Sequence, residues 1–198
     1  MNPANPSTLQ LLPSKIQNKF FPADTPFVRY GTHGDGTCFF HSVCAARNEH
    51  GYLTVPHQEQ QRIGREYRCR FSKHITDGIW GEYARKNNVD LTAEQARRKF
   101  CNSRTWANQA MIQFVAQVMH LNLLFIDSDG ENIYCGVHGD PSEPMIVIMW
   151  VQRSHFEPVG VVRGMKTGQT AVQFVFDPQE DASIVNHILG AYKGECAA

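Results

Sequence analysis

The sequence predicts an α+β fold in which helices flank a small mixed sheet. Segments with helical hydrophobic periodicity are concentrated before residue 120, and most strand-like segments come after it. The chain has 198 residues, of which 42% are hydrophobic and 19% are charged. It is long enough to form one domain with a core that needs no disulfide or metal for support.

The N-terminal residues 1–26 are expected to form an extended or mobile arm, because they contain five prolines and little periodicity. We expect this arm to pack locally through Leu9, Leu11, Leu12 and Phe20. The domain itself is predicted to span 27–198 and to begin with a strand at Phe27–Tyr30. A glycine-punctuated turn, Gly31–Thr37, follows. The segment 163–198 is expected to extend the domain by a strand and a helix.

The predicted helices rest on apolar residues that recur at helical spacing. One helix begins near Cys38, and another occupies His57–Ile75. A short helix is capped by Thr92 and Gln95, whose side chains can satisfy unpaired amides. The helix that begins at Thr105 has a broad apolar stripe, formed by Trp106, Ala110, Phe114 and Val118.

The predicted strands follow that last helix. They are expected at 121–126, 133–137, 145–151, 155–162 and 171–176. A final helix is predicted to have its N-cap at Asp177, to run to about Leu189 and to stop at Gly190.

Composition and charge exclude several classes of protein. Nineteen basic residues balance nineteen acidic ones, so no global field favours nucleic acid or an anionic membrane. The segment 62–104 carries eleven basic and five acidic residues, and a nucleic-acid interface there would show steep salt dependence. The longest apolar run, Met145–Val151, is far too short to span a membrane. No secretory signal is encoded, so we expect a cytoplasmic, reducing environment.

The six cysteines form no C-x-x-C pair and have no regular spacing, so no metal site is expected. We expect most of them to be small buried hydrophobes and at most two to be reactive. Cys38 differs because it follows a glycine turn and begins a helix. The partial positive charge of a helix start lowers a thiol pKa, and the thiolate is the nucleophile. On periodicity alone, a buried structural cysteine is the more common interpretation.

Three blocks of the sequence carry residues of catalytic type. The first block, G-D-G-T-C-F-F-H from Gly34 to His41, resembles the nucleophile motif of the OTU (ovarian tumour) deubiquitinases. The block that begins T-W-A-N-Q-A at Thr105 is similar to a middle block in which a Trp opens a long helix. The third block, from Ile146 to Val159, resembles the strand that leads to the family's histidine. Together they cover roughly residues 28 to 162, in the family's order, and imply a papain-like cysteine protease fold.

The resemblance implies that Cys38 attacks the carbonyl of an isopeptide bond, with His155 acting first as base and then as acid. The family commonly places Asp or Asn two residues after the histidine, where this chain has Glu157. In a strand that residue shares a face with His155. Some members use the acid before the cysteine instead, so Asp35 is the rival orienting residue. A structural role for Asp35 in the glycine turn is the plainer interpretation.

The oxyanion hole is expected to use the backbone amides of Asp35, Gly36, Thr37 and Cys38. Trp106 is expected to pack beneath the active-site loops, with a role in a substrate channel as the alternative.

The implied partners are ubiquitin, polyubiquitin chains and ubiquitin-like proteins, and no cofactor is needed. The alternative is a catalytically weak, OTU-like module that binds ubiquitin. The short format and the F-F-H sequence after Cys38 are reminiscent of viral members, which would act in a host cytosol against ubiquitin-dependent immune signalling.

Overall fold

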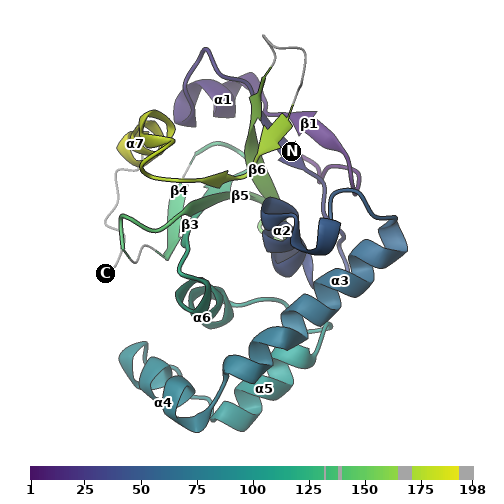
Figure 1. Ribbon diagram of the computed structural model, residues 1–198, viewed down its shortest axis with the longest axis vertical. Coiled ribbons are helices and arrows are strands. Elements are labelled where there is room, and N and C mark those ends of the chain that lie inside the picture. Colours follow the sequence, from purple (N-terminus) through teal and green to yellow (C-terminus); the bar gives the residue numbers. More distant parts are fainter. Residues whose placement is uncertain (132, 138–139, 165–170, 192–198) are drawn as a thin grey trace.

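The centre of the molecule is a mixed sheet with helices on both faces (Figure 1). The computed structural model describes residues 1–131, 140–164 and 171–191, and the backbone of 133–137. The strands are β1 Leu9–Leu11, β2 Phe27–Tyr30, β3 Asn122–Asp127, β4 Ile133–Val137, β5 Met145–Val151, β6 His155–Arg163, β7 Ala171–Gln173 and β8 Val175–Phe176. Their order is β1-β2-β6-β5-β3-β4, and β7 and β8 pair with β6 and β5. The predicted α+β architecture is confirmed.

The third sequence block, Ile146 to Val159, forms the paired strands β5 and β6. These strands are antiparallel, and Val151 lies opposite His155. The turn between them is tight because Gln152 and Arg153 both adopt the left-handed region, with φ of 51° and 54°. On its other side β6 pairs antiparallel with β2, over Val159 to Val161. His155 is therefore held at the first position of a strand that pairs on both sides.

The helices confirm the predicted pattern with shifted boundaries. They are α1 Ser14–Phe20, α2 Cys38–Arg47, α3 His57–Arg70, α4 Asp77–Lys86, α5 Ala93–Cys101, α6 Gln109–Met119 and α7 Ala182–Ala191, with short 3₁₀ turns at Glu49–Gly51 and Phe71–His74. The capping box of Thr92 and Gln95 is present. Helix α6 begins four residues later than predicted, because Asn108 caps it through the Met111 amide. Helix α4 was not predicted.

Two predictions at the C-terminal end are corrected. The strand predicted over 171–176 is split into β7 and β8. The last helix begins at Ala182, because the Asp177 carboxylate accepts hydrogen bonds from the amides of Gln179 and Glu180 in a turn before it. It also continues through Gly190, where it was expected to stop.

Residues 1–26 contain secondary structure that the sequence did not predict. Strand β1 pairs with β2, and α1 lies beside the sheet. Leu12 and Phe20 are buried, as expected, but Leu9 and Leu11 are 51% and 72% exposed. The expectation that these two leucines pack locally is wrong, because β1 turns them outward at the edge of the sheet.

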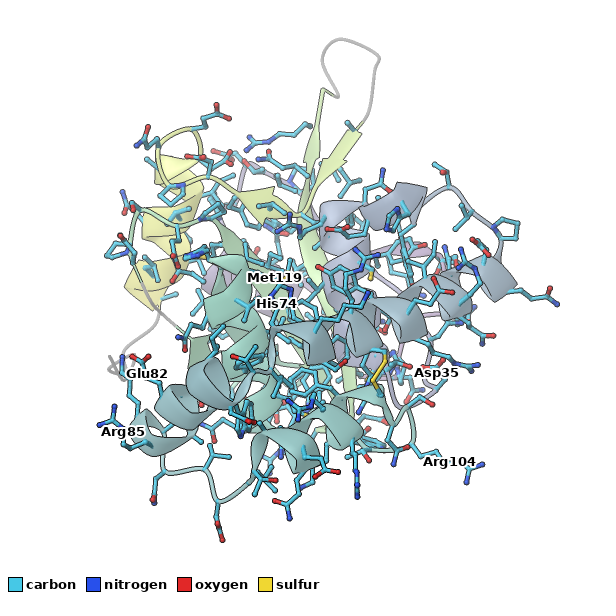
Figure 2. The ribbon with its side chains drawn as sticks, turned by 60° about the horizontal axis from the view of Figure 1, so that its bottom comes forward. Asp35, His74, Glu82, Arg85, Arg104 and Met119 are labelled. Carbon is cyan, nitrogen blue, oxygen red and sulfur yellow. A yellow bond between two sulfur atoms is a disulfide. The ribbon has the colours of Figure 1, made fainter. Side chains whose placement is uncertain are left out.

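Two cysteines were misjudged. Cys69 on α3 and Cys101 on α5 form a disulfide, the yellow bond in Figure 2. Cys38 and Cys44 are buried free thiols, as expected for most of the six. The side chain of Cys135 and the whole of Cys196 lie outside the described residues.

Most arginines of the basic segment 62–104 have partners within the chain. Arg62 forms ion pairs with Glu59 and Glu66, and Arg98 with Glu94. Arg68 and Arg97 donate to backbone carbonyls. The ion pairs reduce the positive field that a nucleic-acid interface would need.

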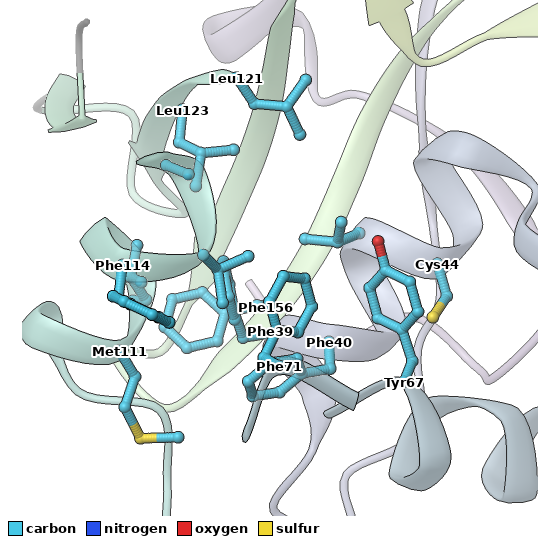
Figure 3. Close-up of a cluster of buried hydrophobic side chains, with 14 of the residues drawn as sticks. Phe39, Phe40, Cys44, Tyr67, Phe71, Met111, Phe114, Leu121, Leu123 and Phe156 are labelled. Carbon is cyan, nitrogen blue, oxygen red and sulfur yellow. The ribbon is translucent and has the colours of Figure 1, made fainter. Parts of the chain in front are cut away.

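The two faces of the sheet carry separate cores. Alternation along β3 sends Leu123 and Phe125 to one face and Leu124 to the other. The first core packs the sheet against α2, α3, α5 and α6, and it contains the aromatic cluster of Figure 3. The second packs it against α1 and α7. In the described part of the chain, no helix has the length and apolar character needed to cross a membrane.

Candidate active site

Cys38 is the first residue of α2, at the end of the glycine turn. Gly36 in that turn has φ +83°, and a Cβ there would lie 2.3 Å from the Ser103 carbonyl oxygen. Only glycine satisfies both conditions, so the turn can press against the loop after α5. The prediction that a helix begins at Cys38 is confirmed.

Cys38 and His155 line the same pocket, which has a volume of about 360 Å³. Gly34, Gly36, Thr32 and Trp106 are also in its lining. A Cβ at Gly34 would lie 4.0 Å from both Nδ1 and Cε1 of His155. The fold therefore brings the predicted nucleophile and base together, with the Nδ1 edge of the imidazole facing the nucleophile loop.

The carbonyl of Phe156 joins the two sides of this pocket. It accepts hydrogen bonds from the hydroxyls of Ser42 at 2.8 Å and Thr32 at 2.6 Å. Ser42 lies one helical turn after Cys38, and Phe156 directly follows His155. Two buried hydroxyls thus fix the nucleophile helix and its preceding loop to the strand that carries the histidine.

Thr32 also determines which nitrogen of the neutral His155 ring carries the proton. Its Oγ1 lies 3.2 Å from Nε2 of His155. Because the single hydroxyl proton of Thr32 goes to Phe156, its oxygen must accept a proton from Nε2. Nδ1 is then unprotonated in the neutral ring, which is the form that can take a proton from a thiol.

Glu157 is fully buried and lies close to the histidine. Its Oε1 is 3.7 Å from Nε2 of His155, too far for a hydrogen bond. The same Oε1 accepts the backbone N–H of Ala4 at 2.6 Å, and Oε2 forms an ion pair with Arg29 at 2.8 Å. Burial raises the pKa of Glu157, while Ala4 and Arg29 oppose the rise. Glu157 therefore places a negative charge, paired with Arg29, beside the imidazole without forming a hydrogen bond to it.

Asp35 faces another histidine. Its Oδ1 lies 3.2 Å from Nε2 of His41, and the hydroxyl and amide of Thr37 donate to the same oxygen. Burial alone would raise the pKa of Asp35, but the hydrogen bonds from His41 and Thr37 outweigh it and hold that pKa well below its usual range. The contacts of Asp35 shape the nucleophile loop, and none of them involves His155 in the described part of the chain.

The backbone amides predicted to form the oxyanion hole differ in whether they already donate a hydrogen bond within the protein. The Thr37 amide is already donated to Asp35 at 3.1 Å. The Gly36 carbonyl is held by Nη1 of Arg68 at 2.9 Å, which fixes the direction of the peptide unit that follows it. The amides of Asp35, Gly36 and Cys38 stay as the predicted donors.

The ionisation of Cys38 differs from the expectation. The side chain is buried, and this burial raises the pKa of its thiol, although hydrogen bonds with the backbone of Phe156 and Phe39 oppose the rise. Burial also lowers the pKa of His155. Both shifts come from loss of hydration, which opposes the effect of the helix start and favours the neutral thiol and the neutral imidazole over the ion pair.

Trp106 does not open a helix. It lies in the loop before α6, is 56% exposed and lines the pocket. The expectation that it packs beneath the loops is wrong, because the Asn108 cap delays the helix and leaves the indole outside. No group of three or more His, Cys, Asp or Glu side chains within the described ranges is placed to hold a metal ion.

Sequence reasoning missed five residues that support this site: Ala4, Arg29, Thr32, Ser42 and Arg68. One of them left a signal, since an arginine within the apolar strand F-V-R-Y requires a buried acid as partner. Thr32 and Ala4 left none, because a hydroxyl in a turn and a backbone amide are common to most sequences.

Known proteins resemble this chain in structure rather than in sequence. No family model matches the sequence, and no curated protein matches it. An OTU domain solved in complex with ubiquitin is 12% identical, with a TM-score of 0.57 over 95% of this chain and 93% of that one.

The OTU domain of OTUD1 is 16% identical, with a TM-score of 0.51 over 67% of this chain and 85% of that one. The viral OTU domain protease of Qalyub virus is also similar, at 16% identity over 77% and 88% of the two chains with a TM-score of 0.48. The first two likenesses show that this chain has the OTU fold.

Proposed function

We propose that this protein is a cysteine-dependent deubiquitinase that hydrolyses the isopeptide bond after the C-terminal glycine of ubiquitin. The observation that carries the proposal is the geometry around His155. Its Nε2 is satisfied by Thr32, and its Nδ1 edge faces the loop that presents Cys38 in the same pocket. This arrangement suits transfer of the thiol proton to the imidazole.

The reaction follows from these positions. His155 takes the Cys38 proton as the sulfur attacks the carbonyl carbon of the terminal glycine. The backbone amides of the nucleophile loop stabilise the developing oxyanion. The carbon–nitrogen bond then breaks, and the leaving amine takes the proton from His155. Water, activated by the same imidazole, hydrolyses the thioester and releases the ubiquitin carboxylate and the free thiol.

Ubiquitin is the proposed partner because the OTU fold occurs in a domain that was solved in complex with ubiquitin. We extend the proposal to polyubiquitin chains and ubiquitin-like proteins, whose C-terminal residues would enter the same pocket. Action in the cytoplasm, in the host cytosol for a viral protein, stays a prediction. The disulfide between Cys69 and Cys101 argues against a strongly reducing compartment, because thiols are kept reduced there.

A specific observation favours a second candidate, a ubiquitin-binding module with weak catalysis. The thiol of Cys38 is buried and its pKa is raised, and Glu157 lies 2.8 Å from Arg29 but 3.7 Å from Nε2 of His155. A module of this kind would bind ubiquitin but would not form a covalent product with an electrophile.

The deciding experiment uses ubiquitin with a C-terminal electrophile, followed by intact mass measurement. We expect one adduct on the wild-type protein and none on Cys38→Ala or His155→Ala. Cys44→Ala is the matched control, because Cys44 is the other buried free thiol of the same helix.

The same assay compares the two candidate acids. We expect Glu157→Ala to slow labelling more than Asp35→Ala at equal folded fraction, since only Glu157 lies beside the imidazole. If folded wild-type protein forms no adduct but still binds ubiquitin, the proposed enzymatic function is overturned and the ubiquitin-binding module is supported.

A further inference from the structure

The segment Asn2–Ser7 lies in the candidate active site. Pro3, Ala4 and Pro6 line the same pocket as Cys38 and His155. We propose that this segment is the wall of the cleft on the leaving-group side, and that it selects substrates whose leaving amine sits on a narrow, apolar chain such as a lysine side chain. The proposal rests on the proposed function and specifies its substrate.

One end of the segment is fixed to the strand and turn that precede the nucleophile loop. The Ser7 amide donates to the Gly31 carbonyl at 2.8 Å, and the Gly31 amide donates to Thr8 at 2.9 Å. The backbones touch so closely that a Cβ at Gly31 would lie 2.0 Å from the Asn5 carbonyl oxygen. The segment is therefore packed directly beside Thr32.

The other end is fixed to the histidine strand. The Asn2 carbonyl accepts from Nη1 of Arg29, and its side chain accepts from Nε2 of Gln152, each at 3.0 Å. Between them the Ala4 amide donates to Glu157 at 2.6 Å. The wall is thus attached to the same carboxylate that lies beside the imidazole.

The side on which these contacts lie identifies what the wall meets. The acyl group of the substrate stays on the Cys38 sulfur, while the leaving amine must approach His155 to take its proton. Residues 2–4 contact Gln152 and Glu157, which flank His155 in sequence. The segment therefore borders the path of the amine. Pro3 and Pro6 offer that path rigid rings without N–H donors, which suits methylene groups.

The test compares two substrates with the same acyl part. One is ubiquitin joined to 7-amino-4-methylcoumarin, whose weakly basic aryl amine leaves with little help from a general acid. The other is ubiquitin joined through an isopeptide bond to the lysine of a fluorescent peptide, whose amine requires protonation and alignment. The ratio of the two kcat/KM values reports on the leaving-group side alone.

Opening the wall should change this ratio. We expect Pro3→Gly/Pro6→Gly to lower kcat/KM for the isopeptide substrate about tenfold and that for the coumarin substrate less than about twofold. Pro13→Gly/Pro22→Gly is the matched control, because it makes the same exchanges in the N-terminal region outside the pocket. Thermal unfolding establishes that each variant is folded.

A second pair of variants tests the attachment without altering the prolines. Asn2→Ala removes the side-chain oxygen that accepts a hydrogen bond from Gln152, and Asn2→Asp keeps an oxygen acceptor there. We expect the selective loss on the isopeptide substrate in Asn2→Ala alone. An unchanged ratio in folded variants, or an equal loss on both substrates, would overturn the proposal. A wild-type protein that cleaves neither substrate would instead overturn the proposed function.

Discussion

The two sides of the cleft are held by different means. The histidine side is a strand in the middle of a sheet, where the ladder with β5 determines where His155 lies. The nucleophile side is a loop with no ladder. It is held by Arg68, which is buried and donates to the carbonyls of Gly36, Phe100 and Lys99 at 2.9, 2.7 and 3.0 Å.

Electrostatics differ in the same way. On the sheet side a buried anion, Glu157, is paired with Arg29. On the loop side no acidic side chain among the described residues contacts Arg68 directly, and burial lowers the pKa of Arg68 to about 10. The disulfide one residue further along α3 fastens the same two helices that Arg68 joins. The sheet side is thus held by the strand ladder and one buried ion pair, and the loop side by carbonyl contacts and a covalent link.

The largest effect is expected on the sheet side. Arg29→Met leaves the Glu157 carboxylate buried without its cation, which typically costs about 3–5 kcal/mol of folding free energy. Urea unfolding measures the loss. Arg29→Met/Glu157→Met should recover most of it, because the uncompensated charge is gone. A single variant as stable as the double variant would show that the sheet, and not the pair, holds this side.

The next effect concerns the loop side. Cys69→Ser/Cys101→Ser opens a link between residues 32 positions apart and should lower the free energy of unfolding by about 2–4 kcal/mol. Wild-type protein in dithiothreitol should match the variant, and the variant itself should not respond to the reductant. Insensitivity of the wild-type protein would contradict the link.

A smaller effect separates catalysis from stability. Thr32→Val removes the acceptor for Nε2 of His155, so the neutral ring is no longer restricted to the reactive tautomer. We expect labelling by the ubiquitin electrophile to slow about tenfold, equivalent to about 1.4 kcal/mol. Thr32→Ser keeps the hydroxyl and should recover most of the rate. Equal loss in both variants would assign Thr32 a packing role.

The smallest expected effect is a displacement of the pH profile. Burial lowers the pKa of His155 from its ordinary 6.5, and only the neutral ring can accept the thiol proton. The labelling rate should therefore fall only below pH 6.5. Burial raises the pKa of Cys38 above 9.0, so the thiol stays protonated and the rate should stay level up to pH 8. A midpoint above 6.5 in the acid limb would mean that His155 is ion-paired in the resting protein.

Local signals in the sequence determined much of the fold. Amphipathic spacing found α2, α3 and α6, and the Thr92 and Gln95 pair located the start of α5. Helix α4 was missed because its buried residues, Trp80 and Tyr83, are too few to form a periodic stripe. The boundaries of 1–26 and 27–198 stay predictions, although β1 joins the N-terminal residues to the sheet.

What the sequence determined by itself was the α+β class and the two motifs that carry Cys38 and His155, because residue type and spacing are local properties. Tertiary structure alone decided that Asp35 turns to His41, that Thr32 orients His155 and that Ala4 reaches Glu157 across 153 residues. These outcomes depend on contacts between distant segments. Burial, which reverses the expected shift of the Cys38 pKa, likewise exists only once those segments have packed.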